Sequence, residues 1–312
     1  LPIALGVLQA SRQLPQELQL SSWGELSLTG QIKSAPGALC LAHGLSTDDG
    51  QRIVVHPAEA AGEIRRFRMD GVYAEDLRAL VDDLRSGQWT DRLGPLYETA
   101  DGIPEVSHEE IPQEMNLPLT LQAAAWRACM IAVAGAHHLL MLGAAGCGKT
   151  TLARASRYLL PPLDSTELYE QALRYSAAKL SPEWQGSSLE RSFRAPHFSI
   201  SAAALLGGSR KYSLGEVSLA DQGILFLDEI SEYSPNILNL LRQPLEEHVV
   251  QRTRSGQVLR LPARFILFAA ANPCSCGLLF EKEQSCTCTD GGIQRYRQKF
   301  RNPFFDRIDL FV

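Results

Sequence analysis

The sequence predicts an α/β fold built on a parallel β-sheet, preceded by a small α+β unit. Three continuous apolar runs, each too short for a full helix, alternate with helical patterns, as buried parallel strands do. They are residues 137–143, 223–229 and 264–273, and each finishes on polar residues or a glycine-rich turn. The stretch GAAGCGKTT overlaps the end of the first run. Because parallel strands end at a common edge, we expect the chemistry to lie there.

Composition indicates a globular protein. The 312 residues are 45% apolar, which is enough for a sizeable core, and the length suggests about two domains. Lysine and arginine total 30 against 35 acidic residues, so no net basic field points to nucleic acid, although a ring could keep a basic surface inside its pore. No run of about 18 apolar residues predicts a membrane span.

The start of the chain and its cysteines suggest the cellular setting. The opening LPIALGVLQA lacks both a methionine and the charged region of a signal peptide, so we expect a piece of a longer protein. Four of the seven cysteines fall within CSCGLLFEKEQSCTC, a spacing closer to a metal site than to a disulfide framework. A reducing, cytoplasmic location is therefore expected.

Three segments are expected along the chain. Residues 1–92 mix helical patterns with strand-like runs such as ELSLTGQI and RIVVHP. Residues 93–118 are rich in proline, glycine and acids, which is typical of a linker. Residues 119–312 form the main domain, and they open with the helical pattern TLQAAAWRACMIAVAG, for which Gly135 is the expected C-cap.

The glycine-rich stretch predicts a phosphate-binding loop. Its pattern is Gly143-x-x-x-x-Gly148-Lys149-Thr150, with a predicted strand before it and a helical pattern after it. Backbone N–H groups and the helix start would bind phosphate, Lys149 would reach the outer phosphates, and the Thr150 hydroxyl would ligate Mg²⁺. The alternative is a chance glycine turn. The expected cofactor-binding residues of the loop are Gly143, Ala144, Ala145, Gly146, Cys147, Gly148, Lys149, Thr150 and Thr151.

Two later strands end in residues that nucleotide hydrolysis requires. Asp228 and Glu229 follow the second apolar run, where one carboxylate can serve the Mg²⁺ shell and the other can polarise water. Asn272 follows the third run and could hold the attacking water. Alone, two acids after a strand are a weak signal, and an asparagine before Pro273 could be a turn residue. Together with the loop, they indicate one hydrolytic site.

Long phrases then resemble the AAA+ ATPases, in particular their magnesium-chelatase-related ComM/YifB family. They are FRAPHFSISAAALLGG, GEVSLADQGILFLDE, PLEEHVVQRTRSGQVLRLPARFILFAAANPCSCG and RYRQKFRNPFFDRIDLFV. The resemblance implies a P-loop AAA+ core of the ASCE type, with Walker A at 143–150, Walker B at Asp228 and Glu229, and sensor 1 at Asn272. It also implies an arginine finger, for which Arg307 is the first candidate.

Arg307 suits that role because a guanidinium from a neighbouring subunit can neutralise charge on the γ-phosphate. The alternative is a local surface ion pair with Asp306 and Asp309. Three other arginines compete for the role, namely Arg295, Arg297 and Arg301.

This chain departs from the family in two respects. Ala144, Ala145 and Cys147 stand where the family usually has two prolines and a threonine; these positions shape the loop, so we expect binding to survive. Cys147 also adds an oxidisable thiol beside the phosphates. The family's helical lid would follow residue 312, and we expect it to be absent from this chain.

Two basic segments are candidates for strand contact. LLGGSRKYSLGEV carries Arg210 and Lys211, and VVQRTRSGQVLRLP carries Arg252 and Arg254 in a predicted hairpin. In the family the corresponding loops face the central pore, which implies sequence-independent, salt-sensitive DNA binding. The alternative is a solvated hairpin with ordinary surface arginines.

The cysteine pairs form a candidate zinc site. Cys274 and Cys276 are followed, nine residues on, by Cys286 and Cys288, and four thiolates can surround Zn²⁺ tetrahedrally. Such a site would be structural, since it leaves no open position. Reduced, unligated cysteines are the alternative.

The amino-terminal segment resembles the Lon-protease-like domain of the same family, with the fold of ribosomal protein S5 domain 2. Lon-type enzymes carry a lysine beside the glycine of this segment, but here it reads Pro36-Gly37-Ala38-Leu39. We therefore expect a non-catalytic scaffold, in which Cys40, His43 and His56 are packing or surface residues.

The resemblance implies an ATP-driven, homo-hexameric ring motor acting on single-stranded or branched DNA. The most concrete hypothesis is a branch-migration helicase serving recombination in natural transformation, with ATP, Mg²⁺ and structural Zn²⁺ as cofactors. One alternative is a chelatase-type motor that remodels a protein partner for metal insertion, and another is a regulatory nucleotide switch with little turnover.

Overall fold

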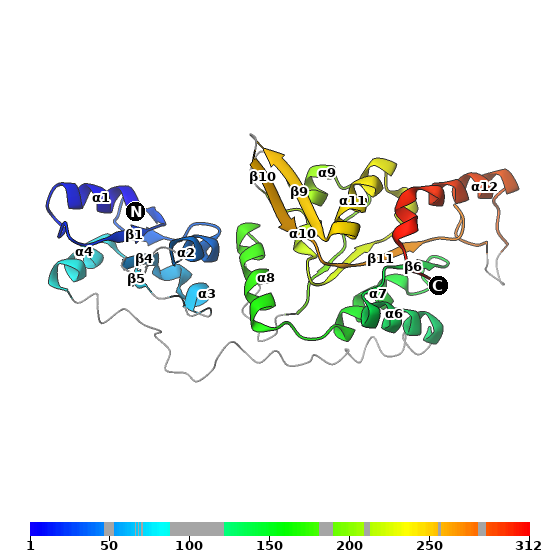
Figure 1. Cartoon of the computed structure of the whole chain (residues 1–312), viewed down its shortest axis with the longest axis horizontal. Helices are drawn as coiled ribbons and strands as arrows, with labels where there is room; N and C mark the ends of the chain where they lie inside the picture. The colour runs from blue at the N-terminus through cyan, green and yellow to red at the C-terminus, as the bar shows by residue number, and fades with distance from the viewer. Residues whose placement is uncertain are drawn as a thin grey trace. The chain divides into compact units, whose positions relative to one another are not determined.

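The computed structural model shows two compact units (Figure 1). The first comprises Leu1–Glu105 and Leu168–Ser187, and the second comprises Val106–Glu167 and Ser188–Val312. The residues that the structure describes are 1–46, 53–65, 67, 69, 71–87, 122–180, 190–208, 213–254, 257–279 and 285–312. The linker expected at 93–118 lies outside them. Each unit is described by itself below.

Unit 1 is built on a small parallel sheet in the order β1-β4-β5. Its elements are α1 (Pro2–Ala10), β1 (Leu20–Ser22), β2 (Glu25–Leu26), β3 (Ile32–Lys33), α2 (Ala38–Ser46), β4 (Ile53–Pro57), η1 (Ala58–Ala60), α3 (Ala61–Arg65), β5 (Val72–Ala74) and α4 (Leu77–Ser86). The run RIVVHP forms β4, which is buried along its whole length. The run ELSLTGQI is instead a tight antiparallel pair, β2 and β3, joined by a turn.

Helix α8 (Ser165–Ala177) belongs mostly to unit 1, although its sequence lies inside the stretch 119–312. The Tyr169 hydroxyl lies 2.7 Å from Nδ1 of His43, and the Cys40 thiol donates to the Leu173 carbonyl at 3.1 Å. Burial raises the pKa of Cys40, so its thiol stays protonated and able to donate. His43 and Cys40 thus hold α2 against α8, and His56, which is buried, accepts a hydrogen bond from the Trp23 indole.

Unit 2 contains a five-stranded sheet in the order β12-β6-β11-β8-β7, in which every neighbouring pair is parallel. The strands are β6 (Leu139–Leu142), β7 (Phe193–Arg194), β8 (Ile224–Leu227), β11 (Ile266–Ala271) and β12 (Leu310–Phe311). The three predicted strands are confirmed as β6, β8 and β11, and β11 lies between the other two. Phe268 is the common register point, because it pairs with Leu139 on one side and with Phe226 on the other.

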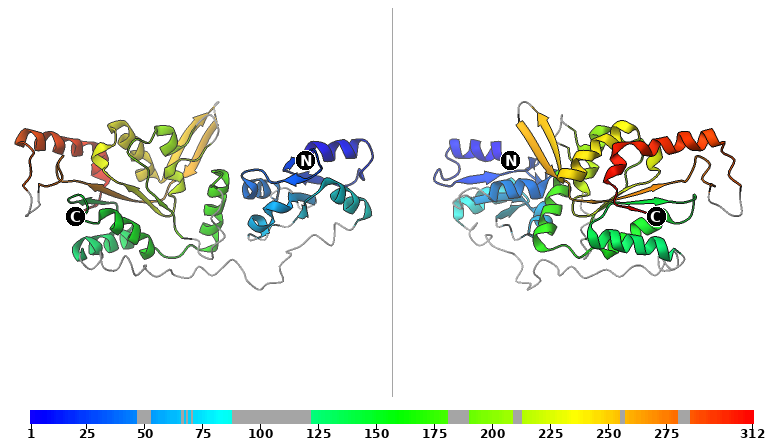
Figure 2. Two further views of the ribbon diagram at one scale, coloured as in Figure 1. Left: turned by 180° about the vertical axis from the view of Figure 1, so that it is seen from behind. Right: turned by 45° about the vertical axis from the view of Figure 1, so that its right-hand side comes forward.

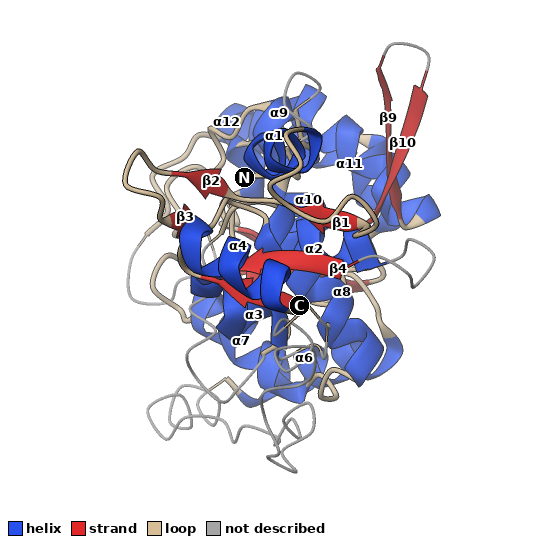
Figure 3. Ribbon diagram, turned by 90° about the vertical axis from the view of Figure 1, so that its left-hand side faces the viewer, coloured by secondary structure: helices blue, strands red, loops and turns tan. Residues whose placement is uncertain are grey.

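Helices cover both faces of this sheet (Figures 1 and 2). They are α6 (Ala123–Gly135), α7 (Lys149–Ala155), η3 (Ser156–Leu159), α9 (Ala202–Leu206), α10 (Glu216–Leu219), η4 (Ile230–Glu232), α11 (Pro235–Glu247), α12 (Asp290–Gln298), η5 (Lys299–Arg301) and η6 (Pro303–Arg307). A hairpin, β9 (Val249–Arg254) with β10 (Gln257–Pro262), follows α11 (Figure 3). Among the described helices, none combines the length and apolar character needed to cross a membrane.

Alternation along β8 divides the core of unit 2 into two layers. Leu225 and Leu227 pack with the α11 side, whereas Ile224 and Phe226 pack with α6 and α7. Helix α6 runs through Gly135, and the predicted C-cap is wrong by one residue. Ala136 ends the helix instead, with a left-handed φ of 52°, and its N–H bonds the Val133 carbonyl.

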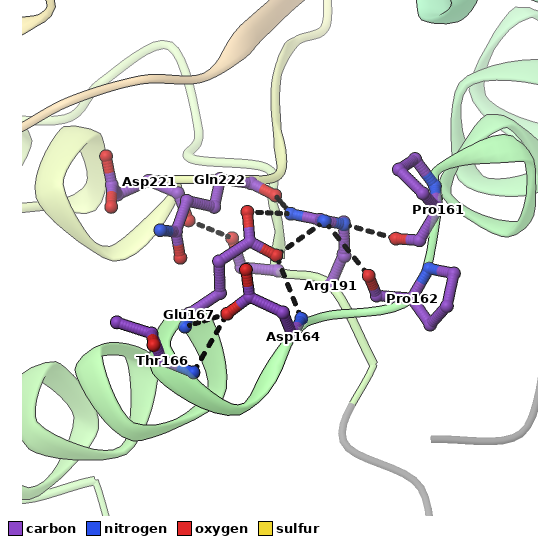
Figure 4. A network of polar contacts seen from close by, with 9 residues as sticks. Pro161, Pro162, Asp164, Thr166, Glu167, Arg191, Asp221 and Gln222 are labelled. Atoms are coloured by element: carbon purple, nitrogen blue, oxygen red, sulfur yellow. Dashed lines mark hydrogen bonds and ion pairs between the residues drawn. The ribbon is translucent and has the colours of Figure 1, made fainter. Parts of the chain in front are cut away.

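A buried arginine fixes the chain ahead of α8 (Figure 4). The Arg191 side chain is 10% exposed and donates to the Glu167 carboxylate at 2.8 Å. It also donates to the carbonyls of Pro161 at 2.5 Å, Pro162 at 3.2 Å and Gln222 at 2.9 Å. This guanidinium therefore ties the turn before α8 to the end of the sheet, and several carbonyls depend on it for a donor.

We expect Arg191→Met to lower the free energy of unfolding by about 1–3 kcal/mol, because the Glu167 carboxylate and the carbonyls of Pro162 and Gln222, which are partly buried, would lose their donor. Chemical denaturation followed by circular dichroism measures this change. Arg297→Met, which alters an exposed arginine on α12, is the matched control and should be nearly neutral. Equal stability of the two variants would contradict the role of Arg191.

Candidate functional site

The loop 143–151 connects β6 to α7 and has the backbone of a phosphate-binding loop. Gly146 and Gly148 adopt φ of 77° and 92°, the left-handed region that glycine enters without a steric penalty. Gly148 is the N-cap of α7, so the helix begins at Lys149 with its first N–H groups facing the loop. The Gly143 N–H donates to the Ala271 carbonyl at 3.2 Å, which fixes the loop to the end of β11.

Lys149 is folded beneath this loop. Its ammonium donates to the carbonyls of Gly143 and Ala144, both at 2.7 Å, and lies 3.4 Å from Oδ1 of Asn272. The Cys147 thiol is 3.8 Å away from the same nitrogen. The positive charge is therefore held at the centre of the loop, where an anion entering from solvent would meet it.

The end of β8 faces the same loop. The Thr150 hydroxyl donates to Oδ2 of Asp228 at 2.9 Å, and the Glu229 N–H donates to the other oxygen of Asp228 at 2.9 Å. A hydroxyl and a carboxylate at this spacing are oxygen ligands of the kind that Mg²⁺ prefers. Glu229 has a φ of 48°, an unusual conformation for a residue with a side chain, and its carboxylate is exposed. Such strain clusters at functional sites.

These groups surround one pocket of about 310 Å³. Its lining residues are Ala145, Gly146, Gly148, Lys149, Thr150, Thr151, Asp228, Glu229, Ala271 and Asn272. The three sequence-predicted parts of the site, namely the glycine-rich loop, the acid pair and Asn272, thus meet at the carboxyl edge of the sheet. A cation, two carboxylates, a hydroxyl and an amide around one pocket can bind a phosphate chain with Mg²⁺ and activate water beside it.

The four predicted cysteines also lie together, and the first of them follows Asn272 by two residues in the chain. Their sulfur atoms are all within 4.8 Å of one another. Sγ of Cys274 is 3.4 Å from that of Cys276 and 3.7 Å from that of Cys286, and Cys276 and Cys286 are 3.5 Å apart. A tetrahedral Zn²⁺ with Zn–S bonds of about 2.3 Å places its sulfur ligands about 3.8 Å apart. Three of the four sulfurs are near this spacing, and that of Cys288 lies within 4.8 Å of them, an arrangement compatible with a tetrahedral cation.

Backbone contacts favour a thiolate in this cluster. The N–H groups of Leu278 and Thr287 hydrogen-bond to the sulfur of Cys276 and lower its pKa to about 5. The N–H of Cys288 acts in the same direction on Cys286, but desolvation and the neighbouring thiols outweigh it and raise the pKa of Cys286 to about 12. Four thiols brought together without a cation thus resist full ionisation, and a dication would reverse that effect.

Comparison with known proteins relates both residues 1–59 and residues 119–312 to a magnesium-chelatase subunit. A family described as "Magnesium chelatase, subunit ChlI" matches residues 119–312, and one described as "Subunit ChlI of Mg-chelatase" matches residues 1–59. The YifB protein of Escherichia coli is 34% identical over 99% of this chain, and the competence protein ComM of Haemophilus influenzae is 35% identical over 100% of it. The chain belongs to the magnesium-chelatase-related ComM/YifB family of AAA+ proteins.

The chain covers only part of the length of these relatives. The chain spans 59% of the length of YifB and 60% of that of ComM. The magnesium-chelatase 38 kDa subunit of Cereibacter sphaeroides is a more distant relative, 28% identical over 157 residues, which cover 45% of this chain and 46% of that protein. The family match over residues 119–312 and the parallel sheet together establish the family and its α/β P-loop fold for this chain.

Arg307, the expected arginine finger of this AAA+ chain, lies on η6 and does not line the pocket. Its Nε donates to the Glu246 carboxylate at 2.6 Å, and one Nη donates to the Pro303 carbonyl at 2.6 Å. Sequence reasoning named Asp306 and Asp309 as alternative partners. The observed ion pair instead reaches across to α11, and Asp309 accepts from the His138 N–H.

The basic segments of this AAA+ chain are described only in part. Arg210 and Lys211 lie outside the described residues. Arg254 is the last residue of β9, and nothing is described of its side chain. Arg252 is half-buried on the same strand and donates to the Gly207 carbonyl at 3.0 Å, so it holds the hairpin against the end of α9.

Tyr296 was missed by the sequence reasoning. It lies on α12 and is 7% exposed; its hydroxyl donates to the Asn272 carbonyl at 2.8 Å and lies 3.1 Å from Oγ of Ser231. Burial raises its pKa, so the phenol keeps the proton that it donates. The available signal was a single aromatic residue within the polar stretch GGIQRYRQ, which is too short to establish a packed face.

We expect Lys149→Met to weaken binding of a fluorescent ATP analogue by more than about tenfold, because charge-assisted contacts with phosphate would be lost. Equilibrium titration in the presence of Mg²⁺ measures the dissociation constant. Lys33→Met, which removes an exposed lysine of β3, is the matched control. Unchanged affinity in Lys149→Met would exclude this pocket as the phosphate site.

Proposed function

We propose that this chain is the ATP-hydrolysing part of a ring-forming motor that acts on DNA, most concretely a hexameric branch-migration helicase in recombination during natural transformation. The observation that carries the proposal is the meeting of Lys149, Thr150, Asp228, Glu229 and Asn272 at one pocket. The similarity to a protein named for competence supports the choice of DNA as the partner. A cytoplasmic location is part of the same proposal.

Each pocket residue has a role that its position supports. Bound Mg²⁺ would supply positive charge against the developing negative charge on the phosphates. The Thr150 hydroxyl and Asp228 would hold this ion, and Lys149 would exchange its loop carbonyls for phosphate oxygens. Glu229 would accept a proton from water, and the Asn272 amide would orient that water.

Completion of the site by a second subunit is also proposed. Arg307 would reach the nucleotide of a neighbouring copy, which requires it to leave Glu246. That exchange is feasible because Glu246 is half-exposed and an exposed ion pair contributes only about 0–1 kcal/mol. Arg295, Arg297 and Arg301 remain competing candidates, since all three are exposed on or next to α12.

The remaining site assignments follow the same logic. We propose that Cys274, Cys276, Cys286 and Cys288 hold a structural Zn²⁺, supported by their sulfur geometry. Unit 1 is proposed to be a non-catalytic scaffold related to Lon-protease-like domains, supported by the packing contacts that occupy Cys40, His43 and His56.

We propose that the two basic segments contact DNA, and that one of their arginines also has a structural role. Arg210, Lys211, Arg252 and Arg254 are the proposed phosphate contacts, as in the sequence-based expectation. Arg252 also has a structural role, because it donates a hydrogen bond to the Gly207 carbonyl. Its substitution would therefore disturb the hairpin as well as DNA binding. Arg254 is therefore the more informative test.

A chelatase-type motor is the second candidate. It is supported by the similarity to a magnesium-chelatase 38 kDa subunit, and it would remodel a protein partner for metal insertion. This candidate requires a large partner subunit and predicts no response of ATP turnover to DNA. The two candidates therefore differ in one measurement, the ATPase rate at low salt with and without DNA.

We expect Glu229→Gln to bind ATP with parent affinity and to lose at least about 100-fold in turnover, because the amide cannot accept the proton. Phosphate release and nucleotide retention after gel filtration measure the two properties. Glu25→Gln, which alters an exposed glutamate of β2, is the matched control. Negligible turnover in the parent protein would instead indicate a regulatory switch.

We expect Arg254→Ala to lose DNA stimulation of ATP hydrolysis while the basal rate stays within about twofold, since a phosphate contact would be removed without touching the pocket. Thr253→Ala, an exposed neighbour on β9, controls for the hairpin itself. Stimulation of Arg254→Ala by junction DNA at the parent level would argue against the hairpin as a DNA contact.

The proposed function as a whole is tested in the full-length protein. The assay combines oligomer mass, ATP hydrolysis and branch migration on a four-way junction. We expect a ring, a DNA-stimulated ATPase and ATP-dependent migration. If DNA neither binds nor stimulates hydrolysis at low salt, the DNA motor is wrong.

A further inference from the structure

The four-cysteine cluster lies along the chain between two parts of the nucleotide site. Cys274 and Cys276 directly follow Asn272 and Pro273 at the end of β11. Cys286 and Cys288 directly precede Thr289, the N-cap of α12, whose hydroxyl accepts from the Gly292 N–H at 3.2 Å. A metal held by all four sulfurs would therefore fix the start of α12 relative to the end of β11.

The first cysteine pair leads into a glycine turn that lies beside the glycine-rich loop. The Gly277 N–H donates to the Cys274 carbonyl at 3.0 Å, which closes a turn, and Gly277 has a φ of 81°. A Cβ placed at Gly277 would lie 3.9 Å from the backbone nitrogen of Ala145 and 4.0 Å from Cγ of Asn272. A side chain at this position would just reach the loop backbone and the Asn272 side chain, so the turn lies beside both without filling the space between them.

Helix α12 returns to the site through Tyr296. Its hydroxyl donates to the Asn272 carbonyl at 2.8 Å and lies 3.1 Å from the hydroxyl of Ser231. Ser231 lies on η4, the short helix that begins immediately after Glu229. Tyr296 therefore links the backbone carbonyl of Asn272 to the turn that carries Glu229. In the proposed function, Asn272 and Glu229 are the residues that orient and deprotonate the attacking water.

Helix α12 has only a narrow apolar face of its own. Tyr296 is buried and Ile293 is half-buried, and the remaining residues of the helix are polar or glycine. Its C-terminal side is held by Phe300, whose ring centroid lies 5.6 Å from that of Tyr296, and by Lys299, which pairs with Glu232 at 3.1 Å. Since most helical stability in proteins comes from packing of an apolar face, the position of α12 depends on additional constraints at its start.

We propose that the four-cysteine cluster is a metal-dependent brace of the nucleotide site, and that Tyr296 is the positioning residue through which it acts. Zn²⁺ on the four thiolates fixes α12, and Tyr296 then holds Asn272 and the Glu229 turn in the geometry for hydrolysis. This inference rests on the proposed ATPase function. Coupling of this kind is reciprocal, so nucleotide bound in the pocket stabilises the metal in the cluster.

The first test measures zinc release from the full-length protein to a chromogenic chelator, with and without Mg²⁺ and a non-hydrolysable ATP analogue. We expect the nucleotide to slow release by at least about fivefold. Lys149→Met, which is expected to bind nucleotide more than about tenfold more weakly, should show no slowing at a nucleotide concentration that just saturates the parent protein. Equal release rates with and without nucleotide in the parent, or a purified protein without zinc, would overturn the brace.

The second test is Tyr296→Phe, which keeps the ring and removes the hydroxyl. We expect kcat to fall about five- to tenfold, with KM for ATP and zinc content unchanged and Tm lowered by only about 2–4 °C, because one hydrogen bond positions the reacting groups. Tyr169→Phe in unit 1 is the matched control, since it removes a tyrosine hydrogen bond at a residue that does not line the pocket. Parent-like kcat in Tyr296→Phe would overturn the positioning role.

The two tests separate this inference from the function on which it rests. If the parent protein hydrolyses no ATP, the proposed function fails, while the zinc-release experiment still decides whether nucleotide and metal are coupled. If ATP is hydrolysed and neither zinc release nor Tyr296→Phe behaves as expected, the brace fails and the ATPase stands.

Discussion

The parallel pairing of β11 with β6 on one side and β8 on the other is the constraint on which the site depends. Because all three strands run in one direction, their carboxyl ends deliver the glycine-rich loop, Asp228 with Glu229, and Asn272 to one edge. Register matters as much as direction, since a shift of one residue would exchange the two faces of β11. The alternating core residues on both faces of β8 and β11 resist that shift, so burial of the core fixes the geometry of the site.

The sequence predicted the parts of the fold that carry a continuous pattern. β6, β8 and β11 were predictable because a buried parallel strand is apolar along its length, and the site residues were predictable because each follows such a run. β7 and β12 were not, since each has two residues and is defined by its neighbour in the sheet. The place of α8 could not be predicted either, because its amphipathic pattern tells which face is buried but not against which unit it packs.

Side-chain partners across the fold were the least predictable part of the site. Sequence neighbours suggested Asp306 and Asp309 for Arg307, but the partner is Glu246, about sixty residues earlier on α11. In the same way, the pairing of Arg252 with Gly207 depends on how the hairpin packs beside α9. Long, flexible guanidinium side chains select partners after the backbone is in place. Their exposed ion pairs are weak enough to exchange, which is what an arginine that serves a neighbouring subunit requires.

The cysteine cluster and Tyr296 illustrate how a polar helix can acquire a fixed position. Helix α12 has only a narrow apolar face, made by Ile293 and Tyr296, so its orientation depends strongly on its two ends. The metal link proposed for its start would shorten the chain between Asn272 and the helix, and so reduce the entropy that ordering the helix costs. The Tyr296 hydroxyl, carried by this helix, donates a hydrogen bond to the carbonyl of Asn272. The position of the helix is thereby linked to that of Asn272. A structural cation outside the pocket can in this way determine the geometry of groups inside it.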